Sequence, residues 1–228
     1  MKPFPFKIID LTHGLSSNIP TWDGSRGFAH HLHHDYDPKS VYKFRTHKIA
    51  MNEGVGTHMD SPAHCFSNGR HIHELDLGDL AAPCIVIDIS GKAHETYCLS
   101  VQDVEDFEKD FGRIPGGSFV ITLTGWGKRW RDRDKYRNNL VFPTISNEAA
   151  QLFLKRAVVG IGIDTLSPDR PENGFPVHAA MLGAGKYIVE NIANAETLPP
   201  TGSYSVAFPM KIVDGTEAPV RLIALVGS

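Results

Sequence analysis

Short apolar segments, separated by Gly, Pro, Asn and Asp, recur along most of the chain. Runs of this length and punctuation predict β-strands. Two of them, 84–90 and 157–164, are almost continuously apolar, which is typical of strands covered on both faces. The expected strands are 6–12, 42–51, 84–90, 118–126, 157–164, 186–191, 204–212 and 220–226.

Helical periodicity is confined to two segments. In 101–111 apolar side chains recur every three or four residues, with Ser100 as the expected N-cap and Asp103 completing a capping box. The segment 146–157 repeats the pattern and opens with a serine that can cap it. We therefore predict an α/β fold with a β-rich core and few helices. Because no repeat, low-complexity tract or change of composition marks a linker, we expect one domain over residues 1–228.

Charge and composition narrow the classes of partner. The 228 residues carry a net charge of -3 with both signs interspersed, so we expect a small-molecule substrate and neither a nucleic-acid nor a membrane partner. Prolines interrupt the N-terminus where an apolar signal segment would lie, and no run approaches the roughly 20 apolar residues of a membrane span. The expected location is therefore the cytoplasm. Three cysteines without a C-x-x-C pair argue against a disulfide framework.

Histidine is unusually concentrated, since nine of the twelve lie between positions 30 and 73, and the segment "GVGTHMDSPAH" (54–64) contains two of them. His58 and Asp60 are two residues apart, so on an extended backbone their side chains share one face and can converge on one cation. Imidazole nitrogen together with carboxylate oxygen suits zinc or manganese better than calcium. The alternative is a polar turn with a hydrogen-bonded surface histidine.

The second half of this segment predicts a proton-transfer group. Ser61 can act as N-cap and Pro62 as the first helical residue, which places His64 in the first turn of a short helix aimed back at the pair. A histidine close to a metal but outside its ligand set is suited to moving protons. Ser61 and Cys65 are weaker candidates for a nucleophile, because no G-x-S-x-G elbow surrounds the serine and adjacent residues of a helical turn diverge.

A metal centre needs at least a third protein ligand. The segment 175–194 offers His178 before a short apolar run and Glu190 inside the strand-like "YIVEN". A buried carboxylate at Glu190 is unfavourable unless it is paired or bound to a metal. The alternative is that Glu190 points into solvent from the polar face of its strand.

These motifs, in this order, resemble the metal-dependent cyclase family, to which bacterial kynurenine formamidases and isatin hydrolases belong. The family motif reads H-x-G-T-H-x-D-x-P-x-H, and "GTHMDSPAH" matches most of it. The likeness extends to 8–24, 122–130, 160–169, 178–190 and 208–225. It implies a β/β/α sandwich-like fold, a homodimer or higher homo-oligomer, and hydrolysis of a small amide, cyclic imide or lactone by metal-activated water.

The resemblance also implies a role for each matching residue. The ligands of one or two divalent ions, zinc or manganese, would be His58, Asp60, His178 and Glu190. Asp60 would bridge the two ions. His64 would be the proton donor and acceptor, and Trp22 in "IPTWDG" would line the substrate pocket.

One position departs from the family motif. Gly54 stands where the motif has its first histidine, and glycine has no side chain with which to bind a metal. Either the centre holds a single ion, or another side chain replaces the histidine, or the protein is a catalytically silent ligand-binding or scaffold relative. The main candidates for a replacement are His31 and His33 of the "HHLHHD" cluster, and the weaker ones are His47 and Glu53. Because the other matching positions keep ligand or acid–base chemistry, we favour an active metal-dependent hydrolase.

Overall fold

A curled β-sheet forms the centre of the molecule. The computed structural model describes residues 4–41 and 43–227. The strand order is β1-β12-β11-β5-β7-β9-β10-β4, and β4 also pairs with β12, so that seven strands close into a ring with β1 added at one side. The strands of this sheet are β1 (Phe6–Asp10), β4 (His58–Asp60), β5 (Ala81–Asp88), β7 (Phe119–Leu123), β9 (Gly160–Ile163), β10 (Tyr187–Glu190), β11 (Ser203–Pro209) and β12 (Glu217–Gly227).

The strands β5, β7 and β9 run parallel and are buried on both faces, as their continuous apolar sequences predict. Alternate side chains enter different cores because successive residues of a strand point to opposite faces. Val86 and Ile121 lie in the core inside the ring, whereas Ile85 belongs to the core beneath the helices. Gly160 faces the ring interior without a side chain, because a Cβ there would come within 2.6 Å of the Tyr187 ring.

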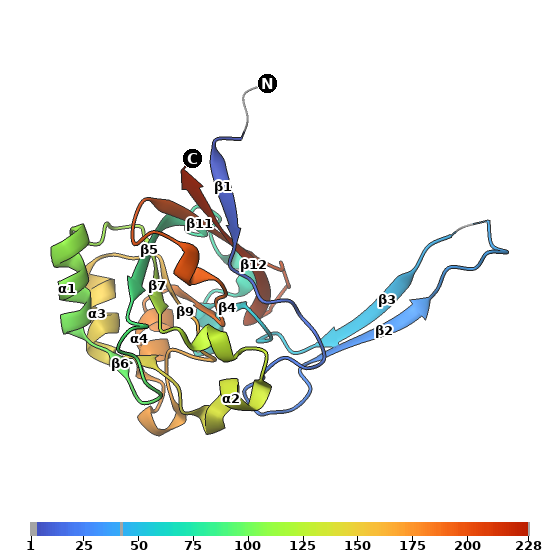
Figure 1. The fold of residues 1–228 in the computed structure, drawn as a ribbon, viewed down its shortest axis with the longest axis horizontal. Helices are drawn as coiled ribbons and strands as arrows, with labels where there is room; N and C mark the ends of the chain where they lie inside the picture. Colours follow the sequence, from blue (N-terminus) through green and yellow to red (C-terminus); the bar gives the residue numbers. More distant parts are fainter. Residues whose placement is uncertain (1–3, 42, 228) are drawn as a thin grey trace.

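Three helices cover one side of the sheet, namely α1 (Val101–Phe111), α3 (Asn147–Lys155) and α4 (Pro176–Gly183) (Figure 1). The first two confirm the predicted segments, and the capping box of Ser100 and Asp103 is present. The helix α4 was not predicted, because its buried residues leave no apolar periodicity to recognise. A shorter helix, α2 (Arg133–Arg137), lies apart from these three, toward the base of the hairpin formed by β2 and β3. Together with the curled sheet, these helices confirm the predicted α/β, β/β/α architecture.

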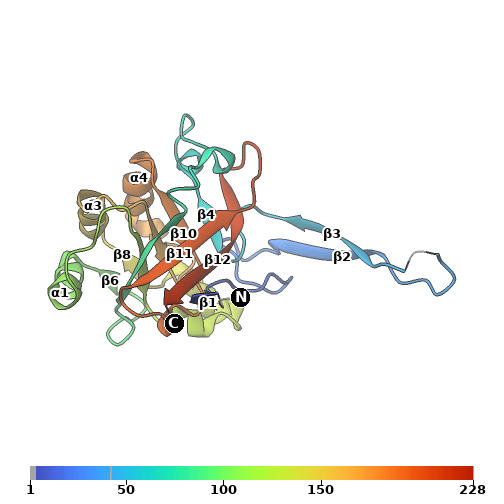
Figure 2. The same ribbon diagram turned by 90° about the horizontal axis from the view of Figure 1, so that it is seen from above.

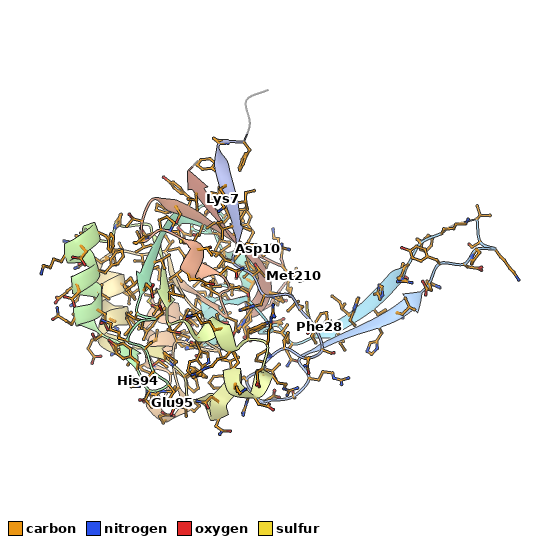
Figure 3. All side chains as sticks on the ribbon, in the orientation of Figure 1. Lys7, Asp10, Phe28, His94, Glu95 and Met210 are labelled. Atoms are coloured by element: carbon orange, nitrogen blue, oxygen red, sulfur yellow. The ribbon has the colours of Figure 1, made fainter. Side chains whose placement is uncertain are left out.

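A two-stranded hairpin projects far from this body (Figures 1 and 2). Its strands are β2 (Phe28–His34) and β3 (Thr46–Met51), so the second strand is shorter than the predicted 42–51, of which residue 42 lies outside the described residues. Figure 3 places Phe28 where the hairpin joins the body, and this side chain is buried there against Ile19 and Val55. The hairpin is therefore anchored at its base, while most of its length has no neighbouring sheet.

The remaining elements are short. A small parallel pair consists of β6 (Cys98–Leu99) and β8 (Thr144–Ile145). Single 3-10 turns lie at Pro62–His64, Ile72–Glu74, Trp126–Arg129, Asn138–Leu140, Pro171–Asn173 and Ala195–Thr197. Over the described ranges, none of the helices combines the length and the apolar character needed to cross a bilayer.

Candidate metal centre

The pairing of β4 with its two neighbours gathers most of the candidate ligands. In β4, His58 and Asp60 alternate with Met59 and therefore share one face. Glu190 of β10 is the register partner of His58, and Glu217 of β12 is the register partner of Asp60. Since residues opposite each other across antiparallel strands lie on the same face, three adjacent strands present four polar side chains to one place.

The polar atoms of this cluster are spaced as metal ligands. The Nε2 atom of His58 lies 3.4 Å from Asp60 Oδ1, 3.4 Å from Glu190 Oε2 and 3.6 Å from Glu217 Oε1. The Nε2 atom of His178, on α4, lies 3.6 Å from Asp60 Oδ2 and 3.4 Å from Glu190 Oε1. Ligands about 2.0–2.1 Å from a tetrahedral zinc ion are separated by about 3.3–3.4 Å. Two groups of three residues with close ligand atoms result, sharing Asp60.

Buried carboxylate oxygens in the cluster lack hydrogen-bond partners. Asp60 is 1% exposed and Glu190 6% exposed. Neither oxygen of Asp60 nor Oε1 of Glu190 accepts a hydrogen bond. Because an ionised carboxylate is costly to bury without compensation, these oxygens fit a cation between them. The alternative that Glu190 points into solvent is wrong.

The two histidines are held so that Nε2 faces the carboxylates. The Nδ1 atom of His58 lies 3.0 Å from the carbonyl oxygen of Gly56, which also accepts a hydrogen bond of 2.8 Å from the Asn191 amide. The Nδ1 atom of His178 lies 2.8 Å from Asp169 Oδ2. When Nδ1 donates to such an acceptor, the lone pair of Nε2 is available to a metal, and the ring orientation is fixed.

Electrostatic contacts within the cluster shift several pKa values. Burial opposes a charge on His58, but Asp60, Glu190 and Glu217 outweigh it and raise the pKa of the imidazole to about 10. The carboxylates around His178 likewise raise its pKa against burial. Burial acts against the ionised form of Asp60, yet the two imidazoles lower its pKa, whereas burial and then Asp60 raise the pKa of Glu190. The carboxylates thus favour a positive charge between them, which protonated imidazoles or a divalent cation can supply.

His64 lies beside this cluster rather than inside it. It ends the 3-10 turn Pro62–His64, which begins after Ser61 as the sequence predicts. The Ser61 hydroxyl, however, donates to the carbonyl of Thr216 at 2.8 Å instead of capping the turn. The Nδ1 atom of His64 lies 3.3 Å from Glu217 Oε2, and this contact raises the pKa of His64.

A cavity of about 480 Å³ opens over the cluster. All six residues predicted for the site line it, namely Trp22, His58, Asp60, His64, His178 and Glu190. Trp22 and Phe175 form an aromatic pair at its wall, with ring centroids 5.9 Å apart. Cys65 also lines the cavity, but burial raises the pKa of its thiol, which disfavours a thiolate nucleophile. The cavity therefore joins the polar cluster to an aromatic surface.

The side chains proposed to replace the histidine missing at Gly54 lie elsewhere or contact other groups. His31 and His33 are on β2 and His47 is on β3, and none of the three lines the cavity. Glu53 lines the cavity, but its Oε2 accepts hydrogen bonds from the backbone N–H groups of residues 216 and 217. Within the described chain, the carboxylate nearest the missing side chain is that of Glu217.

Two residues of the site were not identified from the sequence. Glu217 opens a strand that is apolar apart from Arg221, and this weak signal becomes informative only when β12 is known to pair with β4. Asp169 ends the segment "GIGIDTLSPD", but its link to His178 depends on how α4 folds back against that loop. Glu217 depends on a strand pairing between distant parts of the chain, whereas Asp169 depends on a contact between a loop and the helix that follows it.

Comparisons with known proteins give a consistent result. The sequence model of the family described as "Putative cyclase" matches residues 9–170. The isatin hydrolase of Roseibium aggregatum is 28% identical over 242 residues, covering 96% of this chain and 92% of that protein. The kynurenine formamidase of Geobacillus thermodenitrificans is 25% identical over 215 residues, covering 93% and 94%. A crystal structure of an isatin hydrolase bound to the product analogue thioisatinate has a TM-score of 0.90 and 27% identity, with 98% of this chain and 94% of that one covered.

Proposed function

Because the chain belongs to the cyclase family, we propose that it is a metal-dependent hydrolase that cleaves the C–N bond of a small amide or cyclic imide, or the C–O bond of a lactone. The observation that carries this proposal is the pair of buried carboxylates, Asp60 and Glu190, whose unpartnered oxygens face two oriented imidazoles at the floor of a cavity. A ligand-binding relative without catalysis would not need this arrangement of groups.

An aryl-bearing substrate suits the cavity best. The names of the similar enzymes refer to isatin and to a kynurenine formamide, and in both compounds the amide nitrogen is bonded to a benzene ring. Trp22 is partly exposed and stands beside Phe175 at the cavity wall, so that a planar ring can pack against these side chains. A volume of about 480 Å³ accommodates a compound of this size.

Each polar residue has a distinct part in this proposal. His58, Asp60, His178 and Glu190 would hold one or two divalent ions, zinc or manganese. Such an ion, when bound, activates water and polarises a carbonyl oxygen. His64 holds a proton at an imidazole whose Nδ1 contacts Glu217, which leaves Nε2 to deliver the proton to the departing nitrogen or oxygen. Asp169 fixes the ring of His178.

Metal analysis combined with a hydrolysis screen tests the proposal. We expect the purified protein to contain at least one equivalent of zinc or manganese by mass spectrometry. We also expect it to hydrolyse isatin, an N-formylarylamine or an aryl lactone in an absorbance assay. The control is Asp60→Asn, which keeps the size of the side chain but removes the charge shared by both ligand groups, and it should lose metal and turnover together. A preparation that neither binds these ions nor turns over any of the compounds after reconstitution would favour the silent relative.

A further inference from the structure

The missing histidine at position 54 coincides with a carboxylate that occupies its place. A Cβ atom built on Gly54 would overlap Glu217 Oε1, and it would lie 2.9 Å from Glu217 Cδ and 3.3 Å from His58 Nε2. A side chain at position 54 would therefore point at the Nε2 atom that faces the carboxylates. The carboxylate of Glu217, which begins β12, occupies the same space.

The backbone gives no other reason for this glycine. Gly54 is not among the glycines with positive φ, whereas Gly56, two residues later, has φ of 67°. An L-residue could therefore adopt the backbone of position 54, and only the side-chain space excludes it. A side chain at position 54 and the Glu217 carboxylate thus exclude each other sterically.

We propose that Glu217 is a metal ligand that replaces the missing histidine, so that His58, Asp60 and Glu217 form a complete three-residue site beside the one formed by Asp60, His178 and Glu190. This inference rests on the proposed function, since it presumes that the cluster binds metal. The polar atoms of the first three residues lie within 4.8 Å of one another, as do those of the second three. The two Asp60 oxygens, which accept no hydrogen bond, then contribute one to each site, because Oδ1 faces His58 and Oδ2 faces His178.

Neighbouring groups hold Glu217 in position. Its register partner in β4 is Asp60, and its own N–H donates to Glu53 Oε2 at 3.3 Å, as does the N–H of Thr216 at 3.0 Å. The second oxygen of Glu217 contacts His64 Nδ1 at 3.3 Å. One carboxylate oxygen thus faces the ligand group and the other faces the proton-transfer histidine.

The replacement changes the charge of the first site. Exchanging a neutral imidazole for a carboxylate adds one negative charge, and the whole cluster then has three carboxylates and two imidazoles. Oxygen-rich ligand sets suit manganese, whereas imidazole-rich sets suit zinc. We therefore expect this chain to bind Mn²⁺ more strongly, relative to Zn²⁺, than a variant with the histidine restored.

Metal binding in four proteins tests the proposal without an activity assay. The proteins are the wild type, Glu217→Ala, the double variant Gly54→His/Glu217→Ala, and the control Glu105→Ala, which removes an exposed carboxylate on α1. Each is dialysed against Mn²⁺ or Zn²⁺ and its bound metal is counted, and Mn²⁺ affinity is measured by electron paramagnetic resonance. We expect Glu217→Ala to lose about one ion per chain or at least tenfold in Mn²⁺ affinity, and the control to match the wild type.

The double variant separates ligation from a structural effect. It places a histidine in the space vacated by Glu217, so we expect it to regain bound metal with a shift in preference from Mn²⁺ toward Zn²⁺. Thermal unfolding checks that each variant folds. Unchanged number and affinity of bound ions in a folded Glu217→Ala variant would overturn the role of Glu217 while leaving the proposed hydrolase intact. Absence of metal from the wild type itself would instead defeat the proposed function as well.

Discussion

At the scale of single residues, position in the cluster distinguishes the proposed ligands from the proposed proton-transfer group. His58 presents Nε2 to three carboxylates and His178 presents Nε2 to two, and both have Nδ1 engaged behind them. His64 contacts the outer oxygen of Glu217 and belongs to neither of the two candidate ligand groups. It is also more exposed, with 34% of its side chain accessible. The same residue type therefore has two different environments within a few ångströms, which match the two proposed roles.

This difference predicts the behaviour of His64→Ala. We expect turnover to fall by about 10²–10⁴-fold, because the variant lacks the proton donor for the leaving group. Bound metal should stay at the wild-type level, since both ligand groups remain complete. Steady-state kinetics and metal analysis on the same preparation measure the two effects. Loss of metal in proportion to turnover would make His64 a ligand and contradict its assignment to proton transfer.

At the scale of elements, the short strand β4 organises the site because it pairs on both edges. Its register with β10 and with β12 brings Glu190 and Glu217 to the same face as Asp60. The motif 54–64 and the segment 175–194 offered candidate residues on β4, α4 and β10, and the family resemblance implied their ligand roles. Glu217 could not be predicted in this way, because local patterns determine where strands lie but not which strands pair.

The helix α4 carries His178, and Asp169 links this helix to the preceding loop. Asp169 accepts hydrogen bonds from the N–H groups of Val177 and His178, at 3.2 and 2.9 Å, in addition to its contact with the His178 ring. One carboxylate therefore both satisfies N–H groups at the start of the helix and orients the His178 imidazole that the helix carries. The helix has no periodic apolar face, which is why neither its extent nor this link was predicted.

Substitution of Asp169 separates these two contributions. Asp169→Asn keeps an acceptor for the backbone but loses the charge behind His178, so we expect metal affinity to fall by about 10–100-fold with little loss of thermal stability. Asp169→Ala should lose the same affinity and also unfold at a lower temperature. Competition with a chelator measures the affinity, and calorimetry measures the stability. If both variants lower the unfolding temperature yet bind metal as the wild type does, Asp169 serves the fold alone.

At the scale of the whole molecule, the fold class was predictable and the closure of the sheet was not. Each of the eight predicted apolar segments overlaps a strand, and the two periodic segments are helices. The ring depends on the pairing of β4 with β12, two strands that lie far apart in the sequence. The length of the hairpin beyond the body could not be predicted either, since local patterns indicate where a strand lies but not whether a neighbouring sheet covers it.

One face of the hairpin exposes apolar side chains to solvent. His30 pairs with Ile49 and Leu32 pairs with His47, so these four side chains share one face of the hairpin. The rings of His30 and His47 are 4.3 Å apart, and Leu32 and Ile49 are each 54% exposed. A two-stranded hairpin alone is marginally stable in water. Covering its exposed Leu32 and Ile49 side chains would remove apolar surface from water and so stabilise the hairpin.

We therefore predict that this face packs against a second copy of the chain, which would form the expected homodimer. The double variant Leu32→Glu/Ile49→Lys should dissociate the assembly, because it buries two charged side chains at the contact if the dimer forms. Sedimentation velocity measures the change, with the wild type expected as a dimer or larger assembly and the variant as a monomer. Bound metal should be the same in both proteins, since no ligand lies on the hairpin. A wild type that sediments as a monomer, or a variant that remains assembled, would show that the hairpin face does not hold the copies together.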